Sequence, residues 1–154
     1  MRNGNRLNSR KVILIADDDP DDRLMIQDAF NEHKNPPELL FVEDGEELMR
    51  YLTRKDKYAE NEDYPFPQVV ILDLNMPRMD GRQALREIKS DPKLKHIPVV
   101  VLSTSNVIED IVKCYEDGSN SFLTKPPTYD ELVELTKSFK KYWIETAVLP
   151  PPRL

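Results

Sequence analysis

The chain has 154 residues, a formal net charge of −6, 32% charged residues and 39% hydrophobic residues. This length suits one globular domain with a sizeable core, and an acidic chain without a sustained basic run is a poor binder of nucleic acid. No apolar run reaches the length of a membrane helix, and the N-terminus lacks the apolar segment of a secretory signal. The single cysteine, Cys114, excludes an internal disulfide, so we expect a cytoplasmic protein.

Apolar runs and amphipathic segments alternate along the chain from Lys11 onward. Strands are predicted at 11–16, 38–42, 68–72, 98–102 and 121–124, and helices at 20–33, 45–54, 82–90, 106–116 and 128–146. This alternation predicts an α/β protein with a doubly wound five-stranded parallel sheet and five helices. We expect a disordered lead-in at 1–10, a folded domain at 11–147, a long charged connection at 55–67 and a Pro-rich tail at 148–154.

Local signals support several of these boundaries. Asp19 followed by Pro20 is typical of a helix N-terminus, with the aspartate as N-cap and the proline in the first turn. Thr128 with Glu131 forms a capping-box pattern for the last helix. Gly118 lies where a helix needs a left-handed residue at its C-terminus.

Three of the predicted strands end in polar side chains. Asp17 and Asp18 follow the first strand, Asp73 follows the third, and Ser103 follows the fourth. Parallel strands bring their carboxyl ends to one edge of a sheet, so these side chains should converge. Converging carboxylates repel one another, so they need either a bound cation or raised pKa values. If a cation is bound, all-oxygen ligands favour a hard ion such as Mg²⁺. The alternative for Asp17 and Asp18 is a role as helix caps or solvated charge.

Lys125 follows the fifth predicted strand and precedes two prolines. Its ammonium could reach the same edge of the sheet. A lysine and the Ser103 hydroxyl beside a metal-bound carboxylate would form a cradle for a phosphoryl group. Taken singly, Lys125 could instead be a surface lysine and Ser103 a turn residue.

Together these motifs resemble the receiver domain of response regulators in two-component signalling. The matching segments are Ala16–Pro20, Asp73–Gly81, Leu102–Thr104 and Phe122–Pro126. Their order on successive strand ends makes the resemblance specific, and it extends over about residues 11–145. It implies the flavodoxin-like receiver fold.

The resemblance also implies roles for individual residues. Asp73 would accept a phosphoryl group from a phosphohistidine of a sensor histidine kinase. Asp18, Asp73 and the backbone carbonyl of Asn75 would ligate Mg²⁺, and Asp17 would contact the ion through water. Lys125 would pair with the phosphoryl group.

The same resemblance implies a switch. Ser103 would bind the phosphoryl oxygens and shift toward them, and Phe122 would turn inward as Ser103 moves. The alternative for Phe122 is simple core packing. The resemblance further implies a cis peptide bond between Lys125 and Pro126.

Only a short segment follows the last predicted helix, so we expect output through the receiver surface or by transfer to a histidine phosphotransfer protein. The 55–67 connection and the segment 142–150 resemble stand-alone regulators that work with bacterial phytochromes. This narrower resemblance implies a light-sensing kinase as partner and a homodimer. Trp143 and Leu149 are the candidate dimer contacts, although Trp143 could instead pack on the edge of its own sheet.

Two other functions compete with the receiver hypothesis. A phosphohydrolase of the haloacid-dehalogenase type also uses an aspartate at a strand end, but it needs a second aspartate two residues later, where this chain has Asn75. A degenerate receiver that acts only as a docking module would not need the full set of acids, lysine and serine. We therefore expect no enzymatic activity beyond the protein's own phosphorylation and dephosphorylation.

Overall fold

The computed structural model describes residues 10–59 and 63–151. The strands are β1 (Val12–Ala16), β2 (Glu38–Val42), β3 (Val69–Leu72), β4 (Val99–Ser103) and β5 (Ser121–Thr124). The helices are α2 (Pro20–Asn31), α3 (Gly45–Leu52), η1 (Asp56–Tyr58), α4 (Gly81–Ser90), α5 (Ile108–Glu116), α6 (Tyr129–Phe139) and η2 (Lys140–Thr146). Apart from Arg10, the predicted disordered lead-in lies outside the described residues.

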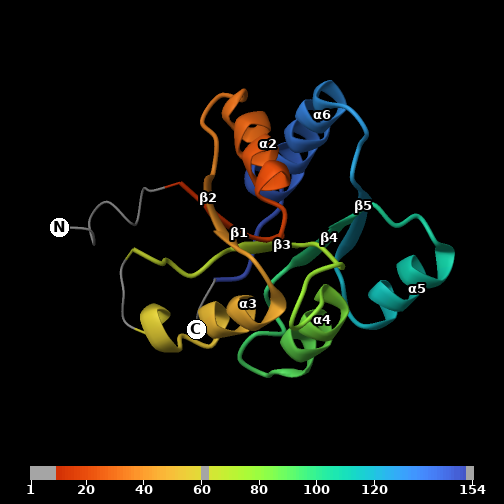
Figure 1. The fold of residues 1–154 in the computed structure, drawn as a ribbon. Helices are drawn as coiled ribbons and strands as arrows, with labels where there is room; N and C mark the ends of the chain where they lie inside the picture. Colours follow the sequence, from red (N-terminus) through yellow and green to blue (C-terminus); the bar gives the residue numbers. More distant parts are fainter. Residues whose placement is uncertain (1–9, 60–62, 152–154) are drawn as a thin grey trace.

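All five strands are parallel and lie in one sheet in the order β2-β1-β3-β4-β5. Figure 1 shows α2 and α6 on one face of this sheet and α3, α4 and α5 on the other. The chain order reverses between β1 and β3, which is where open α/β sheets place their ligand sites. The predicted doubly wound fold is therefore confirmed.

The core has two layers, one on each face of the sheet. Because successive side chains of a strand point to opposite faces, Leu14 and Val70 belong to one layer and Ile13 and Val69 to the other. β1, β3 and β4 are buried along their whole length, as expected for the central strands of a parallel sheet. These apolar strands form a rigid platform for the residues at their ends.

The last predicted helix, 128–146, is not one continuous α-helix. It begins as predicted, with Thr128 Oγ1 accepting the backbone N–H of Glu131 at 3.2 Å. The α-helix ends at Phe139 and continues as the wider π-helix η2. The hydrogen bond from Ala147 N to the Tyr142 carbonyl, 2.7 Å long, closes its last wide turn. Apolar periodicity alone does not distinguish α-helical from π-helical turns.

The long connection after α3 packs on the domain through aromatic side chains. Tyr58 is buried and its ring centroid lies 4.7 Å from that of Tyr51 and 4.8 Å from that of Tyr64. The Tyr51 hydroxyl donates to the Pro65 carbonyl, and the Tyr58 hydroxyl donates to Glu47. The described parts of this connection are thus fixed to α3.

In the portion of the chain that is described, no helix combines the length and apolarity needed to cross a membrane.

Candidate functional site

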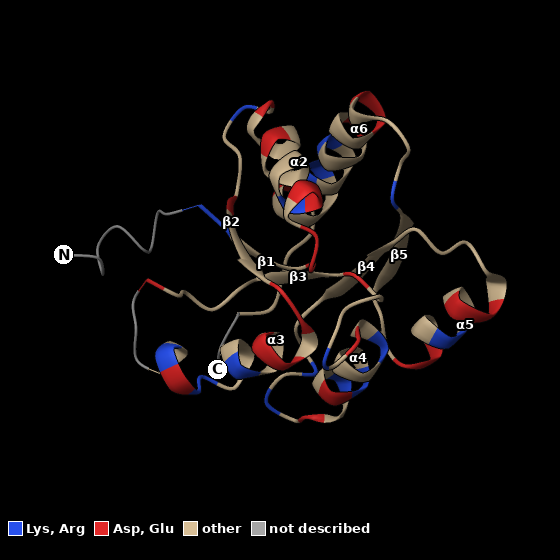
Figure 2. Cartoon of the chain, in the orientation of Figure 1, with Lys and Arg blue, Asp and Glu red and all other residues tan. Residues whose placement is uncertain are grey.

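The strand register brings the two acidic strand ends to the same level. Ala16 pairs with Leu72, so the next residues, Asp17 and Asp73, both leave the sheet at its carboxyl edge. The backbone N–H of Asp73 still donates to the Ala16 carbonyl at 3.0 Å. Figure 2 shows the acidic segment that leads from β1 into α2. The backbone of the sheet therefore sets the relative positions of these acids.

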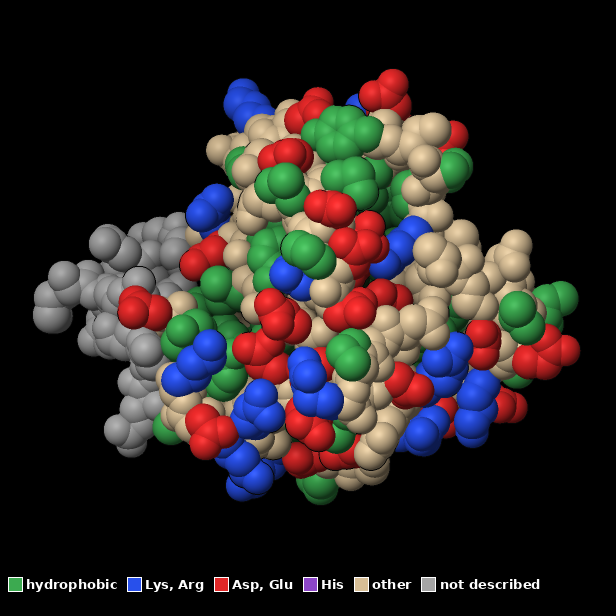
Figure 3. All heavy atoms as spheres, viewed as in Figure 1, with side chains coloured by type: hydrophobic (Ala, Val, Ile, Leu, Met, Phe, Trp, Pro, Cys, Tyr) green, Lys and Arg blue, Asp and Glu red, His purple; other side chains and the backbone are tan. Residues whose placement is uncertain are grey.

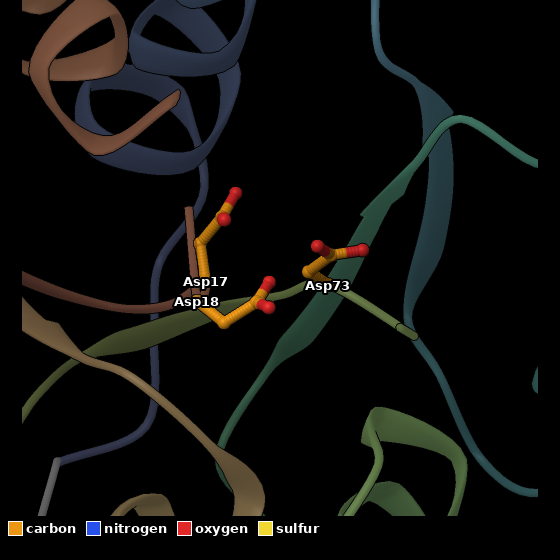
Figure 4. Close-up of side chains that lie close together, drawn as sticks. All are labelled: Asp17, Asp18 and Asp73. Carbon is orange, nitrogen blue, oxygen red and sulfur yellow. The ribbon is translucent and has the colours of Figure 1, made fainter. Parts of the chain in front are cut away.

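Asp17, Asp18 and Asp73 converge as predicted. Each offers a carboxylate oxygen, and these oxygens all lie within 4.8 Å of one another. Figure 4 shows the three side chains meeting between β1 and β3, and Figure 3 shows acidic side chains gathering between the two helix layers on this face. Asp17 and Asp73 are buried, whereas Asp18 is exposed. This cluster could hold a divalent cation with access from solvent.

Burial disfavours the charged forms of the two inner acids. Desolvation raises the pKa of Asp17, although the N–H of Asp19 and the ammonium of Lys125 oppose the rise. Desolvation likewise raises the pKa of Asp73, with a further upward contribution from the charge of Asp18 and a downward one from Lys125. A cation at this edge would lower the cost of keeping both acids ionised.

Lys125 reaches the cluster from the end of β5. Its backbone N–H donates to the Ser103 carbonyl at 2.9 Å, which continues the pairing of β4 with β5 beyond Thr124. Its Nζ lies 3.0 Å from Asp17 Oδ2 and 3.2 Å from Asp73 Oδ2. The predicted meeting of this lysine with the acidic strand ends is confirmed.

Ser103 and Asn75 lie around the acids. Ser103 is fully buried at the end of β4, and its Oγ accepts the N–H of Ser105 at 3.2 Å. Asn75 is exposed in the loop after β3, and its N–H donates to Asp73 Oδ1 at 3.3 Å. That hydrogen bond contributes to holding the Asp73 carboxylate in place.

Phe122 is half-buried and packs against the core layer formed with α3, α4 and α5. Its backbone N–H donates to the hydroxyl of Tyr115 in α5 at 3.1 Å, so this hydrogen bond links β5 to α5. The predicted cis bond between Lys125 and Pro126 is wrong, because the described backbone contains no cis peptide bond. The trans form is the intrinsically favoured isomer even before proline.

The loop after β3 is fixed by contacts that the sequence did not indicate. Asp44 caps α3 and is buried. Its Oδ2 accepts a hydrogen bond from Arg78 Nε at 2.7 Å. A Cβ on Gly81 would lie 2.1 Å from the Asp73 carbonyl oxygen, so the loop can return this close to the acid only with glycine there. These contacts position the backbone on both sides of Asn75.

Asp22 also belongs to the geometry of the site, and the sequence reasoning missed it. Its Oδ2 lies 2.8 Å from Lys125 Nζ, which is shorter than the distances from that nitrogen to Asp17 and Asp73. The available signal was its place in the helix. Asp22 is the third residue of α2, one turn after the N-cap Asp19, on the side that faces the strand ends.

This arrangement suits phosphoryl transfer to a carboxylate. A buried aspartate is presented at a fixed strand end, with a cation site on one side and an ammonium on the other. Charge spread over the oxygens of a transferring phosphoryl group needs this kind of prearranged positive field. The same edge of the sheet also carries the Ser103 hydroxyl. Two residues after Asp73, the chain has Asn75 and not a second acid.

The comparisons with known proteins agree with this geometry. The family model of the response regulator receiver domain matches residues 13–137. The chain therefore belongs to the response regulator receiver family of two-component signalling.

Its relatives include light-signalling regulators. Response regulator Rcp1 of Synechocystis sp. is 38% identical over 143 residues, which cover 93% of this chain and 95% of Rcp1. The Mn²⁺-bound structure of Rcp1 has a TM-score of 0.83 and covers 92% of this chain and 99% of that one. The phosphorylated cyanobacterial phytochrome response regulator RcpA is 40% identical, with a TM-score of 0.86 and coverage of 93% and 100%. RPA3017, from red light signalling in R. palustris, is 36% identical, with a TM-score of 0.86 and coverage of 92% and 99%.

Proposed function

We propose that Asp73 is the phosphoryl acceptor of this receiver and that a phosphohistidine of a sensor histidine kinase is the donor. The observation that carries this proposal is the position of Asp73 at the end of β3, between the acids of β1 and the ammonium of Lys125. The functional unit is proposed to comprise residues 11–147.

We propose Mg²⁺ as the cation, held by Asp18, Asp73 and the Asn75 carbonyl, with Asp17 acting through water. The donor set supports this assignment, because oxygen ligands with an exposed side suit a small hard ion that retains waters. The Mn²⁺-bound form of Rcp1 supports a divalent cation at this site. When bound, the ion neutralises charge on the acids and on the phosphoryl oxygens.

The residues of the chain align and stabilise the transfer. A carboxylate oxygen of Asp73 forms the new bond to phosphorus, the P–N bond of the phosphohistidine breaks, and its electron pair returns to the imidazole. Lys125 donates to the phosphoryl oxygens that accumulate charge, and the N–H of Asn75 restrains the Asp73 carboxylate. Orientation and fixed charge supply the catalysis, since a carboxylate is a weak nucleophile.

The phosphorylated state is proposed to signal through Ser103 and Phe122. The aspartyl phosphate adds about one to two negative charges, which favour movement of the Ser103 hydroxyl toward them. Phe122 is half-buried beside α5 and can follow that movement without leaving the core. The change thereby reaches the surface formed by α5, β5 and α6.

A bacterial phytochrome is the proposed donor kinase, and a histidine phosphotransfer protein is the proposed onward acceptor. The similarity to RcpA and RPA3017, both from phytochrome or red-light signalling, supports a light-dependent pathway. We place this exchange in the cytoplasm. We also propose that the protein turns over no other substrate, because Asn75 stands where a haloacid-dehalogenase hydrolase needs its second acid.

A homodimer through the C-terminal region is also proposed, with contacts different from those expected. Trp143 and Leu149 are partly buried and pack against the core layer shared with α2 and α6. Tyr142 and Val148 are instead exposed, by 55% and 98%. They offer apolar contact area to a second copy. A monomeric mass in solution, with and without a phosphoryl mimic, would contradict the dimer.

Labelling with a small phosphodonor tests the central assignment. Purified protein is incubated with phosphoramidate and Mg²⁺, and intact mass spectrometry reports addition of one phosphoryl group. Asp73→Asn should abolish the labelling, whereas Asp21→Asn, which removes an exposed acid from the first turn of α2, should retain it. Undiminished labelling of Asp73→Asn would refute the assignment. Sustained hydrolysis of a generic phosphate ester would favour the hydrolase.

A further inference from the structure

Lys125 is shared among three carboxylates, not two. Its Nζ lies 2.8 Å from Asp22, 3.0 Å from Asp17 and 3.2 Å from Asp73. An ammonium has three N–H donors, so this set of acceptors occupies all of them. A phosphoryl group on Asp73 can gain hydrogen bonds from Lys125 only if the ammonium gives up or shares an existing partner.

The start of α2 explains why Asp22 is directed at Lys125. An acid at the third position of a helix commonly returns to the backbone N–H of the N-cap residue. Here Asp17 Oδ1 accepts the N–H of the N-cap Asp19 at 2.9 Å. Since that donor is already satisfied, the Asp22 carboxylate is free to extend to the ammonium.

The three acids differ in how readily they can release the lysine. The Asp17 side chain is 2% exposed and would remain buried without its partner, whereas the Asp22 side chain is 28% exposed. Water can therefore replace Lys125 at Asp22 at a much lower cost in desolvation than at Asp17. Asp22 is the partner that yields when a new anion forms on Asp73.

From this geometry we propose that Asp22 is a positioning residue that competes with the phosphoryl group for Lys125. In the unphosphorylated protein it holds the ammonium toward α2. In the phosphorylated protein the ammonium turns to the phosphoryl oxygens, and Asp22 becomes solvated. The competition lowers the stability of the phosphorylated state. It also couples the first turn of α2 to the phosphorylation of Asp73. This inference rests on Asp73 being the acceptor.

The test is the affinity for the phosphoryl mimic beryllofluoride at saturating Mg²⁺, measured by calorimetry. Asp22→Asn keeps a polar side chain but removes the competing charge, so the mimic should bind about two- to fivefold more tightly, as expected for a partly exposed ion pair. Asp21→Asn is the matched control, because Asp21 is an exposed neighbour that makes no contact with Lys125. Mg²⁺ affinity measured without the mimic separates this effect from a change at the cation.

Three further variants keep the inference falsifiable. Asp22→Glu retains the charge and should bind the mimic within twofold of the wild type. In a Lys125→Gln background, Asp22→Asn should no longer change mimic affinity beyond the effect of Asp21→Asn. Urea unfolding checks that each variant is folded.

The outcomes distinguish this inference from the proposed function. Mimic affinity that is unchanged or weaker in Asp22→Asn, relative to Asp21→Asn, would overturn the competition. Persistence of the effect without Lys125 would also overturn it. If Asp73→Asn is still labelled by phosphoramidate, the assignment of the acceptor itself fails.

Discussion

Two partly buried lysines lie at opposite ends of the sheet, and their surroundings differ. Lys125, at the carboxyl end, faces the carboxylates of Asp17, Asp22 and Asp73. Lys89, in the last turn of α4, donates to the backbone carbonyls of Ile97 at 2.7 Å and Lys95 at 3.1 Å, near the amino end of β4.

Their pKa values shift in opposite directions. Burial alone would lower the pKa of Lys125, but the hydrogen bond to Asp22 and the charges of Asp17 and Asp73 raise it above its usual range. Burial lowers the pKa of Lys89 to about 8, because carbonyl dipoles compensate less than full charges. The carbonyls make Lys89 a structural contact, whereas the carboxylates make Lys125 a charge that another anion can compete for.

The largest expected effect is the loss of the Lys125 ammonium. Lys125→Ala leaves the acids of the site without their positive partner, so the free energy of unfolding in EDTA at pH 7 should fall by about 3 kcal/mol. Urea denaturation measures this change. Lys137→Ala, at an exposed lysine of α6, should have little effect.

A second signature identifies charge as the cause. Mg²⁺ should stabilise Lys125→Ala more than it stabilises the wild type, since the ion partly replaces the missing positive charge. An equal loss of stability with and without Mg²⁺ would contradict the electrostatic account.

Mg²⁺ bound at the carboxyl edge of the sheet should stabilise the folded protein. At a free concentration about 100 times its dissociation constant, the ion should raise the free energy of unfolding by about 2–3 kcal/mol. Asp18→Asn should remove most of this gain, whereas Asp28→Asn, at an exposed acid of α2 outside the cluster, should keep it. Thermal unfolding with Mg²⁺ or EDTA measures the difference, and a full gain in Asp18→Asn would exclude it as a ligand.

The smallest expected effect concerns Lys89 and pH. Its folded pKa of about 8 lies below the value of about 10.4 for an unfolded lysine, so between these values the unfolded chain binds the extra proton. Stability should therefore rise with pH through this window. Relative to Lys89→Met, the wild type should gain about 2 kcal/mol between pH 7 and pH 10.

Urea unfolding at both pH values measures this difference, in which the titration of other groups cancels. Lys93→Met, at an exposed lysine of the following loop, should show no such trend. If the difference in free energy of unfolding between the wild type and Lys89→Met is the same at both pH values, burial does not lower the pKa of Lys89.

Much of the fold was predictable because the strands are short apolar runs with clear ends. The strands at 38–42 and 121–124 and the caps at Asp19 and Thr128 are confirmed. The π-helical end of the last helix was not predicted, because apolar side chains follow one face in either kind of turn. The fixed connection after α3 was also missed, since its hydrogen bonds involve backbone carbonyls.

The sequence by itself determined which residues end the strands, and hence that Asp17, Asp18, Asp73 and Lys125 would share one edge of the sheet. That inference needs only the alternation of strands and helices and the parallel direction of the strands. Only the tertiary structure decided the trans bond before Pro126, the Asp44–Arg78 contact and the place of Asp22 on Lys125. Side-chain directions in a helix turn and in a loop depend on which hydrogen bonds are already satisfied, and packing alone decides that.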